Sequence, residues 1–118
     1  MSNVVSIHPY FKCHEGKLEA FKELLPEFTS KTSGEDKCHW YDFSIGGDIV
    51  HCREAYDGAY GLLAHLDNVG EIIGRALEVS DLARVEVHGP AAELEKLKEA
   101  LADLNPDYFI YETGIGKP

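Results

Sequence analysis

The spacing of apolar positions changes several times along the chain, and each spacing predicts a type of element. Residues 4–11 are β-branched and aromatic, which predicts a strand, and apolar residues at helical spacing then predict a helix over 17–29, with Pro26 kinking its last turn. Residues 38–45 and 48–56 flank Gly46-Gly47, a dipeptide suited to a hairpin turn. The remaining pattern predicts helices over 57–66, 69–77 and 90–104, and strands over 82–88 and 108–113.

This order of elements is typical of an α+β, ferredoxin-like sandwich, in which helices cover one face of an antiparallel sheet. The other face would carry one of two sets, depending on strand register: His39, Tyr41 and Phe43, or Cys38, Trp40 and Asp42. Neither set is polar enough for a fully solvated surface. We therefore expect a homodimer through the sheet faces, which together form a dimeric α+β barrel.

Composition narrows the class of protein and of partner. A chain of 118 residues predicts one domain over 1–118, and 21 acidic against 11 basic residues argue against nucleic acid or an anionic membrane surface as partner. No apolar run approaches the roughly 20 residues of a membrane span, and no signal-peptide pattern is present. Three cysteines without CxxC spacing favour reduced thiols and a cytoplasmic protein.

His65 is the first candidate for chemistry. It shares one helix side with Leu62, Leu66 and Val69, at spacings of three and four, and therefore points toward the sheet. An imidazole there could exchange a proton near neutral pH or orient a ligand oxygen. The alternative is a histidine at the edge of the core that bonds a backbone carbonyl.

The densest polar cluster of any predicted strand lies at 51–56. Alternation puts His51 and Arg53 on one face and Cys52, Glu54 and Tyr56 on the other. One set could line a cavity between sheet and helices, or the charged residues could pair across strands.

His8 lies in the first strand, where it could meet His51. With His39 or His88 the two could ligate a metal, but no HxH or HxxxH spacing supports this, and we expect no metal site. Cys52 and His51 face opposite ways, so a thiol catalyst is not expected. No GxGxxG, P-loop or GxSxG motif supports a nucleotide-binding or serine-hydrolase function.

Two stretches resemble the antibiotic biosynthesis monooxygenase (ABM) domain family. The first, VVSIHPYFKCHEGKLEAFKELLPEF, is similar to the family's first strand, glycine turn and first helix. The second, KCHWYDFSIGGDIVHCREAYDGAYGLLAHL, is similar to its central hairpin and following helix. Tyr56, Asp57 and His65 match the family's strand-end aromatic, acidic cap and helix histidine, and Gly16 matches its turn glycine. The resemblance covers about residues 3–90.

The resemblance implies a homodimeric barrel with a cavity in each subunit, and a monooxygenase that oxidises a small aromatic or quinol-like substrate with molecular oxygen and without any cofactor. His65 and Tyr56 would be catalytic, His65 as base or orienter, with Tyr56 and Arg53 binding a phenolate. His51 and His8 are further candidates for substrate binding. The alternatives are a non-catalytic dimeric module for small-ligand binding or stress response, and a His/Tyr-dependent cyclase that needs no oxygen.

Overall fold

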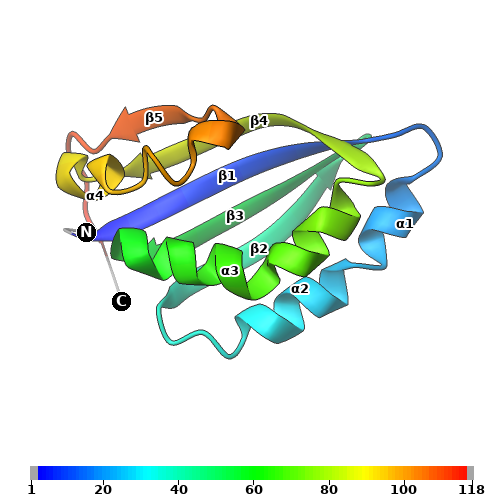
Figure 1. Ribbon diagram of the computed structural model, residues 1–118, viewed down its shortest axis with the longest axis horizontal. Coiled ribbons are helices and arrows are strands. Elements are labelled where there is room, and N and C mark those ends of the chain that lie inside the picture. Colours follow the sequence, from blue (N-terminus) through cyan, green and yellow to red (C-terminus); the bar gives the residue numbers. More distant parts are fainter. Residues whose placement is uncertain (1–2, 117–118) are drawn as a thin grey trace.

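The computed structural model describes residues 3–116 of the chain. One mixed sheet, with strand order β2-β3-β1-β4-β5, is connected by helices in a ferredoxin-like α+β fold, as predicted (Figure 1). The elements in chain order are β1 (Val4–Cys13), α1 (Leu18–Lys22), α2 (Leu25–Thr32), β2 (Cys38–Gly46), β3 (Ile49–Asp57), α3 (Gly58–Ala76), β4 (Ser80–Gly89), α4 (Ala91–Glu95), a 3₁₀ turn (Ala102–Leu104) and β5 (Asp107–Ile110).

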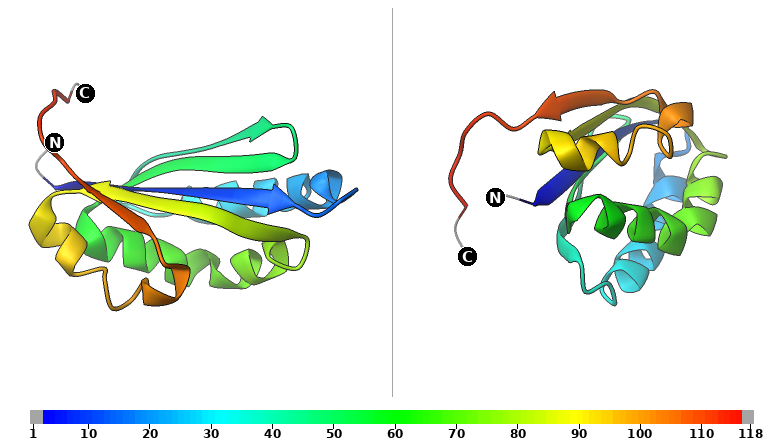
Figure 2. Two further views of the ribbon diagram at one scale, coloured as in Figure 1. Left: turned by 90° about the horizontal axis from the view of Figure 1, so that it is seen from above. Right: turned by 60° about the vertical axis from the view of Figure 1, so that its left-hand side comes forward.

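The helices lie on one face of the sheet. α3 crosses β3, β1 and β2, and α2 packs beside α3, so that the face turned away from them carries no helix within residues 3–116 (Figures 1 and 2). None of the helices in this range is both long and apolar enough to span a lipid bilayer. We refer to the uncovered side of the sheet as the helix-free face.

Two predicted helices differ from the sequence-based expectation. The helix predicted over 17–29 is divided into α1 and α2, and Pro26 lies in the first turn of α2, where its missing N–H costs no hydrogen bond. The helices predicted over 57–66 and 69–77 form the single helix α3, which continues through Gly70. Val69 and Ile72 are buried on its inner side, and this packing outweighs the roughly 1 kcal/mol that a helical glycine costs.

The carboxyl-terminal part is also less regular than predicted. The helix expected over 90–104 is α-helical only at Ala91–Glu95, and a 3₁₀ turn over Ala102–Leu104 is followed by Asn105, whose φ of 47° is left-handed. The last strand is shorter than predicted, and it pairs in parallel with β4. The sheet is therefore mixed rather than purely antiparallel.

A register shift in β2 decides which side chains reach the helices. Cys38 pairs with Tyr56 and Trp40 pairs with Ala55, so His39 is an extra residue in a β-bulge. Beyond the bulge, Tyr41 and Phe43 pack on the helix side. Neither of the two predicted sets therefore forms the helix-free face intact, because the bulge breaks the alternation on which both sets were based.

The buried apolar side chains form two clusters under α3. Leu62 belongs to the cluster around Val5, Tyr56 and Leu97, and Val69 belongs to the cluster around Phe21, Val50 and Ile72. Along α3, His65 lies between Leu62 and Val69. Along β3, Glu54 lies between Val50 and Tyr56. The fold therefore places two buried polar side chains where its two apolar clusters meet.

Candidate active site

A pocket lies between the sheet and α3, with a volume of about 70 Å³. Most of its wall is aliphatic or aromatic, and the strongly polar groups are a carboxylate and an imidazole. Ligand sites commonly have this composition, because apolar walls supply affinity and a few polar groups supply orientation. The lining residues include Ile7, Phe11, Phe28, Tyr41, Phe43, Cys52, Glu54, His65, Val69, Ile73, Leu82 and Val85.

β3 places Glu54 in the wall of this pocket. The residue pairs with Ile7 of β1 and Tyr41 of β2, so it lies in the middle of the sheet, and its side chain is 5% exposed. The hydroxyl of Tyr56, two residues along the same strand face, donates a hydrogen bond of 2.6 Å to Oε1 of Glu54. The sequence indicated this residue only as part of a polar cluster, yet a charged residue in a central strand is itself a signal of a partnered site.

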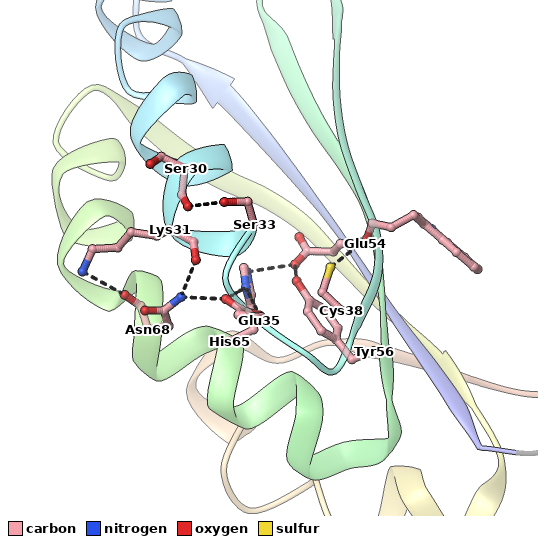
Figure 3. Close-up of polar contacts among 10 residues, drawn as sticks. Ser30, Lys31, Ser33, Glu35, Cys38, Glu54, Tyr56, His65 and Asn68 are labelled. Atoms are coloured by element: carbon pink, nitrogen blue, oxygen red, sulfur yellow. Dashed lines mark hydrogen bonds and ion pairs between the residues drawn. The ribbon is translucent and has the colours of Figure 1, made fainter.

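α3 places His65 between two carboxylates (Figure 3). Nε2 of the ring lies 3.2 Å from Oε1 of Glu54, and Nδ1 lies 2.9 Å from Oε2 of Glu35. The side chain is 2% exposed. Burial lowers the pKa of His65, but the hydrogen bond and charge of Glu54, followed by those of Glu35, outweigh burial and raise it. The ring is therefore an imidazolium over a wider pH range than a free histidine.

Glu35 was not identified from the sequence. It lies in the connection between α2 and β2, within a polar stretch that has the composition of an ordinary loop. Nδ2 of Asn68, on α3 one turn after His65, donates a hydrogen bond of 2.8 Å to Oε2 of Glu35. The same nitrogen donates to the backbone carbonyl of Lys31 at 3.1 Å, which ties α2, the loop and α3 together at the site.

The hydroxyl and thiol groups near Glu54 stay protonated. Burial, followed by the charge of Glu54, raises the pKa of both Tyr56 and Cys52. Burial, followed by the charges of Glu35 and Glu54, raises the pKa of Cys38 to about 11. Tyr56 therefore acts as a hydrogen-bond donor to Glu54, and neither cysteine has the low pKa of a nucleophilic thiolate.

The other residues predicted from the sequence lie on the helix-free face. His8 and His51 stack with ring centroids 5.8 Å apart, and His88 of β4 contacts His8 at 4.8 Å. Arg53 forms an exposed ion pair with Asp42, with an N–O distance of 2.7 Å. The structure thus brings His65 and Tyr56 together, with ring centroids 4.8 Å apart, but separates them from His8, His51 and Arg53 by the thickness of the sheet.

The substrate-binding role of His8, His51 and Arg53 stays a prediction, and it requires a ligand or a partner chain at the helix-free face. In the described part of the chain, no group of three or more His, Cys, Asp or Glu side chains is arranged to hold a metal ion.

The chain is similar to several proteins of known structure. No protein-family model and no curated protein sequence matches it. The crystal structure of MupZ from Pseudomonas fluorescens superposes with a TM-score of 0.94, at 42% identity over 100% of this chain and 92% of MupZ. Rv0793 from Mycobacterium tuberculosis has a TM-score of 0.65, at 23% identity over 74% of this chain and 94% of its own.

A Chloroflexus aurantiacus protein described as a "putative antibiotic biosynthesis monooxygenase" has a TM-score of 0.62, at 17% identity over 75% of this chain and 93% of its own. At that identity the likeness concerns the fold alone. MupZ is similar over the whole chain at much higher identity, and the fold agrees with the ABM-like motifs of the sequence. The chain therefore belongs to the ABM-like family, together with MupZ.

Proposed function

We propose that the chain is a cofactor-independent enzyme that removes a proton from a hydroxyl group of a small aromatic or quinol-like substrate, whose anion then reacts with molecular oxygen. The observation that carries this proposal is the buried carboxylate of Glu54, which lies in an apolar pocket in contact with an imidazole and a phenolic hydroxyl. A carboxylate desolvated in this way interacts strongly with a substrate proton, because little water screens it.

Glu54 is the proposed base. Tyr56 and His65 both contact Oε1 and orient the carboxylate, and Oε2 is the oxygen proposed to accept the proton of a substrate hydroxyl. The aromatic rings of Phe11, Phe28 and Phe43 line the same pocket and offer apolar contacts to the ring of an aromatic substrate. This assignment moves the role of base from His65, the sequence-based candidate, to its carboxylate partner.

His65 and Tyr56 are the other two residues proposed for the reaction. His65 would act through its positive charge, and Tyr56 by donating a hydrogen bond to Glu54. Because its pKa is raised, the His65 ring keeps its proton to higher pH than a free histidine, which makes it a poorer base and favours its role as a positive charge beside a forming phenolate. Tyr56 keeps Glu54 oriented through its hydroxyl.

The oxygen step needs no external reductant. When a hydroquinone becomes a hydroxyquinone, one oxygen atom enters the ring and the other leaves as water, and the substrate supplies all the electrons. The protein's task in this reaction is to form and hold the anion.

The test measures oxygen consumption by metal-stripped protein with a panel of hydroquinones and naphthoquinols. Glu54→Gln removes the base but keeps the shape of the side chain, and we expect turnover to fall by about 10²-fold or more. Glu71→Gln is the matched control, because Glu71 lies on the exposed side of α3 and pairs with Arg75. Turnover of Glu54→Gln equal to that of the control would exclude Glu54 as the base.

One observation favours a second candidate, a cyclase or isomerase that needs no oxygen. A donor on His65 and an acceptor on Glu54 lie 3.2 Å apart, so the pair can remove a proton from one atom of a substrate and return one to another. Turnover under anaerobic conditions would identify this reaction. Reversible ligand binding without turnover in either atmosphere would instead support a non-catalytic binding module.

We also propose that two copies associate through their helix-free faces. Trp40 and Phe109 are 44% and 43% exposed on single chains, and large aromatic groups at that exposure favour an interface. Light scattering after size-exclusion chromatography tests this proposal, and a monomer at micromolar concentration would contradict it.

The three free cysteines fit a reducing compartment such as the cytoplasm.

A further inference from the structure

We propose that Glu35 is a positioning residue for His65: with Asn68 it fixes the ring between two carboxylates, and its carboxylate is the route by which the ring gains and loses a proton. The inference rests on the proposed function, since His65 matters there as the charged neighbour of Glu54. It adds a residue from a loop, outside the pocket wall, to the groups that set the chemistry of the site.

The first support is the geometry of the ring. Both oxygens of Glu35 are within hydrogen-bond distance of Nδ1 of His65, at 2.9 and 3.1 Å, whereas Nε2 lies 3.2 Å from Glu54 (Figure 3). A neutral imidazole can donate from only one nitrogen, but an imidazolium donates from both. Two carboxylates on opposite sides of the ring therefore favour its charged form, and Glu35 makes the shorter contact.

The second support is the hold on Glu35 itself. A glutamate in a loop would ordinarily move among several rotamers, but Nδ2 of Asn68 donates to its Oε2 at 2.8 Å. Asn68 is in turn fixed by the backbone carbonyl of Lys31 at the end of α2. His65 and Asn68 are three residues apart on α3, so one face of this helix carries both the ring and the amide that positions its partner.

The third support is access to solvent. Glu54 contacts Tyr56, which is fully buried, and Cys52, which is 1% exposed, so neither leads outward. The Glu35 side chain is 13% exposed and borders a surface hollow that Thr29, Ser33 and Tyr41 also line. Of the two described carboxylates that contact the ring, Glu35 is therefore the one that also borders a surface hollow.

The proton step conserves charge and atoms. The Nδ1 proton of the imidazolium passes to the Glu35 carboxylate, which leaves a neutral ring that still donates from Nε2 to Glu54. The Glu35 carboxyl group then releases the proton to water in the hollow, and protonation runs through the same steps in reverse. The titratable groups that face the ring are Glu54 and Tyr56 from β3, Tyr41 from β2 and Glu35 from the loop.

The test follows His65 by NMR without any substrate. In Glu35→Gln the titration midpoint of the ring is expected to fall by about one pH unit or more, because one of two adjacent negative charges is lost. Exchange of the ring N–H with water is expected to slow several-fold, because an amide cannot accept the proton. Glu35→Asp, which keeps the charge, should restore both properties, and the Glu71→Gln control should change neither. If Glu35 had only a structural role, its substitution would lower thermal stability without moving the titration midpoint of His65.

An unchanged midpoint or unchanged exchange in Glu35→Gln would overturn the proposal. If this variant does not fold, Asn68→Ala decides: it frees the Glu35 carboxylate from its clamp, and the midpoint should fall, whereas a wild-type midpoint would overturn the proposal. Failure of the proposed function is separate, because that depends on turnover and on Glu54→Gln. Lost turnover in Glu54→Gln together with a wild-type titration in Glu35→Gln would remove Glu35 alone.

Discussion

Nε2 of His65 lies 3.2 Å from Oε1 of Glu54, with both side chains at least 95% shielded from solvent. One residue comes from the inner side of α3 and the other from the middle of β3, and the two apolar clusters of the core lie on either side of the pair. The contact joins helix to sheet through two buried polar side chains. Stability, proton chemistry and pocket shape are therefore coupled through these two groups.

Truncation of Glu54 should destabilise the fold strongly. Glu54→Ala leaves the ring of His65 and the hydroxyl of Tyr56 buried without the acceptor that both use. Removal of one partner from a buried ion pair typically lowers the free energy of unfolding by about 3–5 kcal/mol. Urea unfolding measures the loss. Glu71→Ala, at an exposed pair, should change it by less than about 1 kcal/mol, and equal losses in the two variants would contradict the assigned role.

The hydroxyl of Tyr56 should contribute on its own. Tyr56→Phe keeps the buried ring and removes the donor to Glu54, at a cost of about 1.5–3 kcal/mol for a hydrogen bond to a charged group. Turnover should also fall, because the carboxylate loses one of the two contacts that orient it. Tyr60→Phe is the control, since Tyr60 is exposed at the start of α3. A Tyr56→Phe variant as stable as this control would show that the Tyr56 hydroxyl contributes nothing to holding Glu54.

Stability should depend on pH through His65 with a definite sign. The folded pKa of His65 is raised above its unfolded value, so the charged ring contributes fully below about pH 6.5, and this contribution is lost as the pH rises through the folded value. The difference in unfolding free energy between wild type and His65→Gln should therefore shrink as the pH increases from about 6 to 9. A difference that grows with pH would mean that the ring is buried neutral.

Much of the fold follows from local pattern. The period-two and period-3.6 spacings identify β1, the β2–β3 hairpin and β4, because each of these elements buries one regular stripe. The same spacing identifies the residues of α3 as helical, but it divides this single helix into two. The bulge at His39 was not visible in this way, since one extra residue changes the facing of Cys38 without changing composition. The irregular segment after α4 was missed because its leucines keep helical spacing while they pack in turns.

The candidate site, like the fold, can be predicted only where local spacing determines the position of a residue. The helical position of His65 and the strand position of Tyr56 are sufficient to bring the two toward each other, and the structure has their rings in contact. Glu35 depends on a loop conformation and on a clamp by Asn68, which lies 33 residues away in the chain. Such contacts are set by tertiary packing, so alternation and helical spacing contain no information about them.

Two histidines of the helix-free face, His8 and His51, should make the protein sensitive to acid. Burial, followed by the charges of His88 and His51, lowers the pKa of His8, and burial also lowers the pKa of His51, whose Nε2 is buried without a hydrogen-bond partner in residues 3–116. Glu86 on β4 opposes both shifts. Because the folded state binds these protons less tightly than the unfolded chain, the free energy of unfolding should fall as the pH drops below about 6.5.

Substitution of His8 separates this effect from general acid denaturation. His51, His8 and His88 form a row of neighbouring rings with His8 in the middle. In His8→Gln this central ring can no longer gain a positive charge, so the loss of stability between about pH 6.5 and 5 should be smaller than in wild type. His39→Gln, in the bulge of β2 away from the row, is the matched control and should retain the wild-type pH dependence. The same series, followed by light scattering, reports on self-association: like charges gathered on one face should dissociate a dimer that buries it. If acid affects His8→Gln and His39→Gln equally, the row is solvated and does not determine the response.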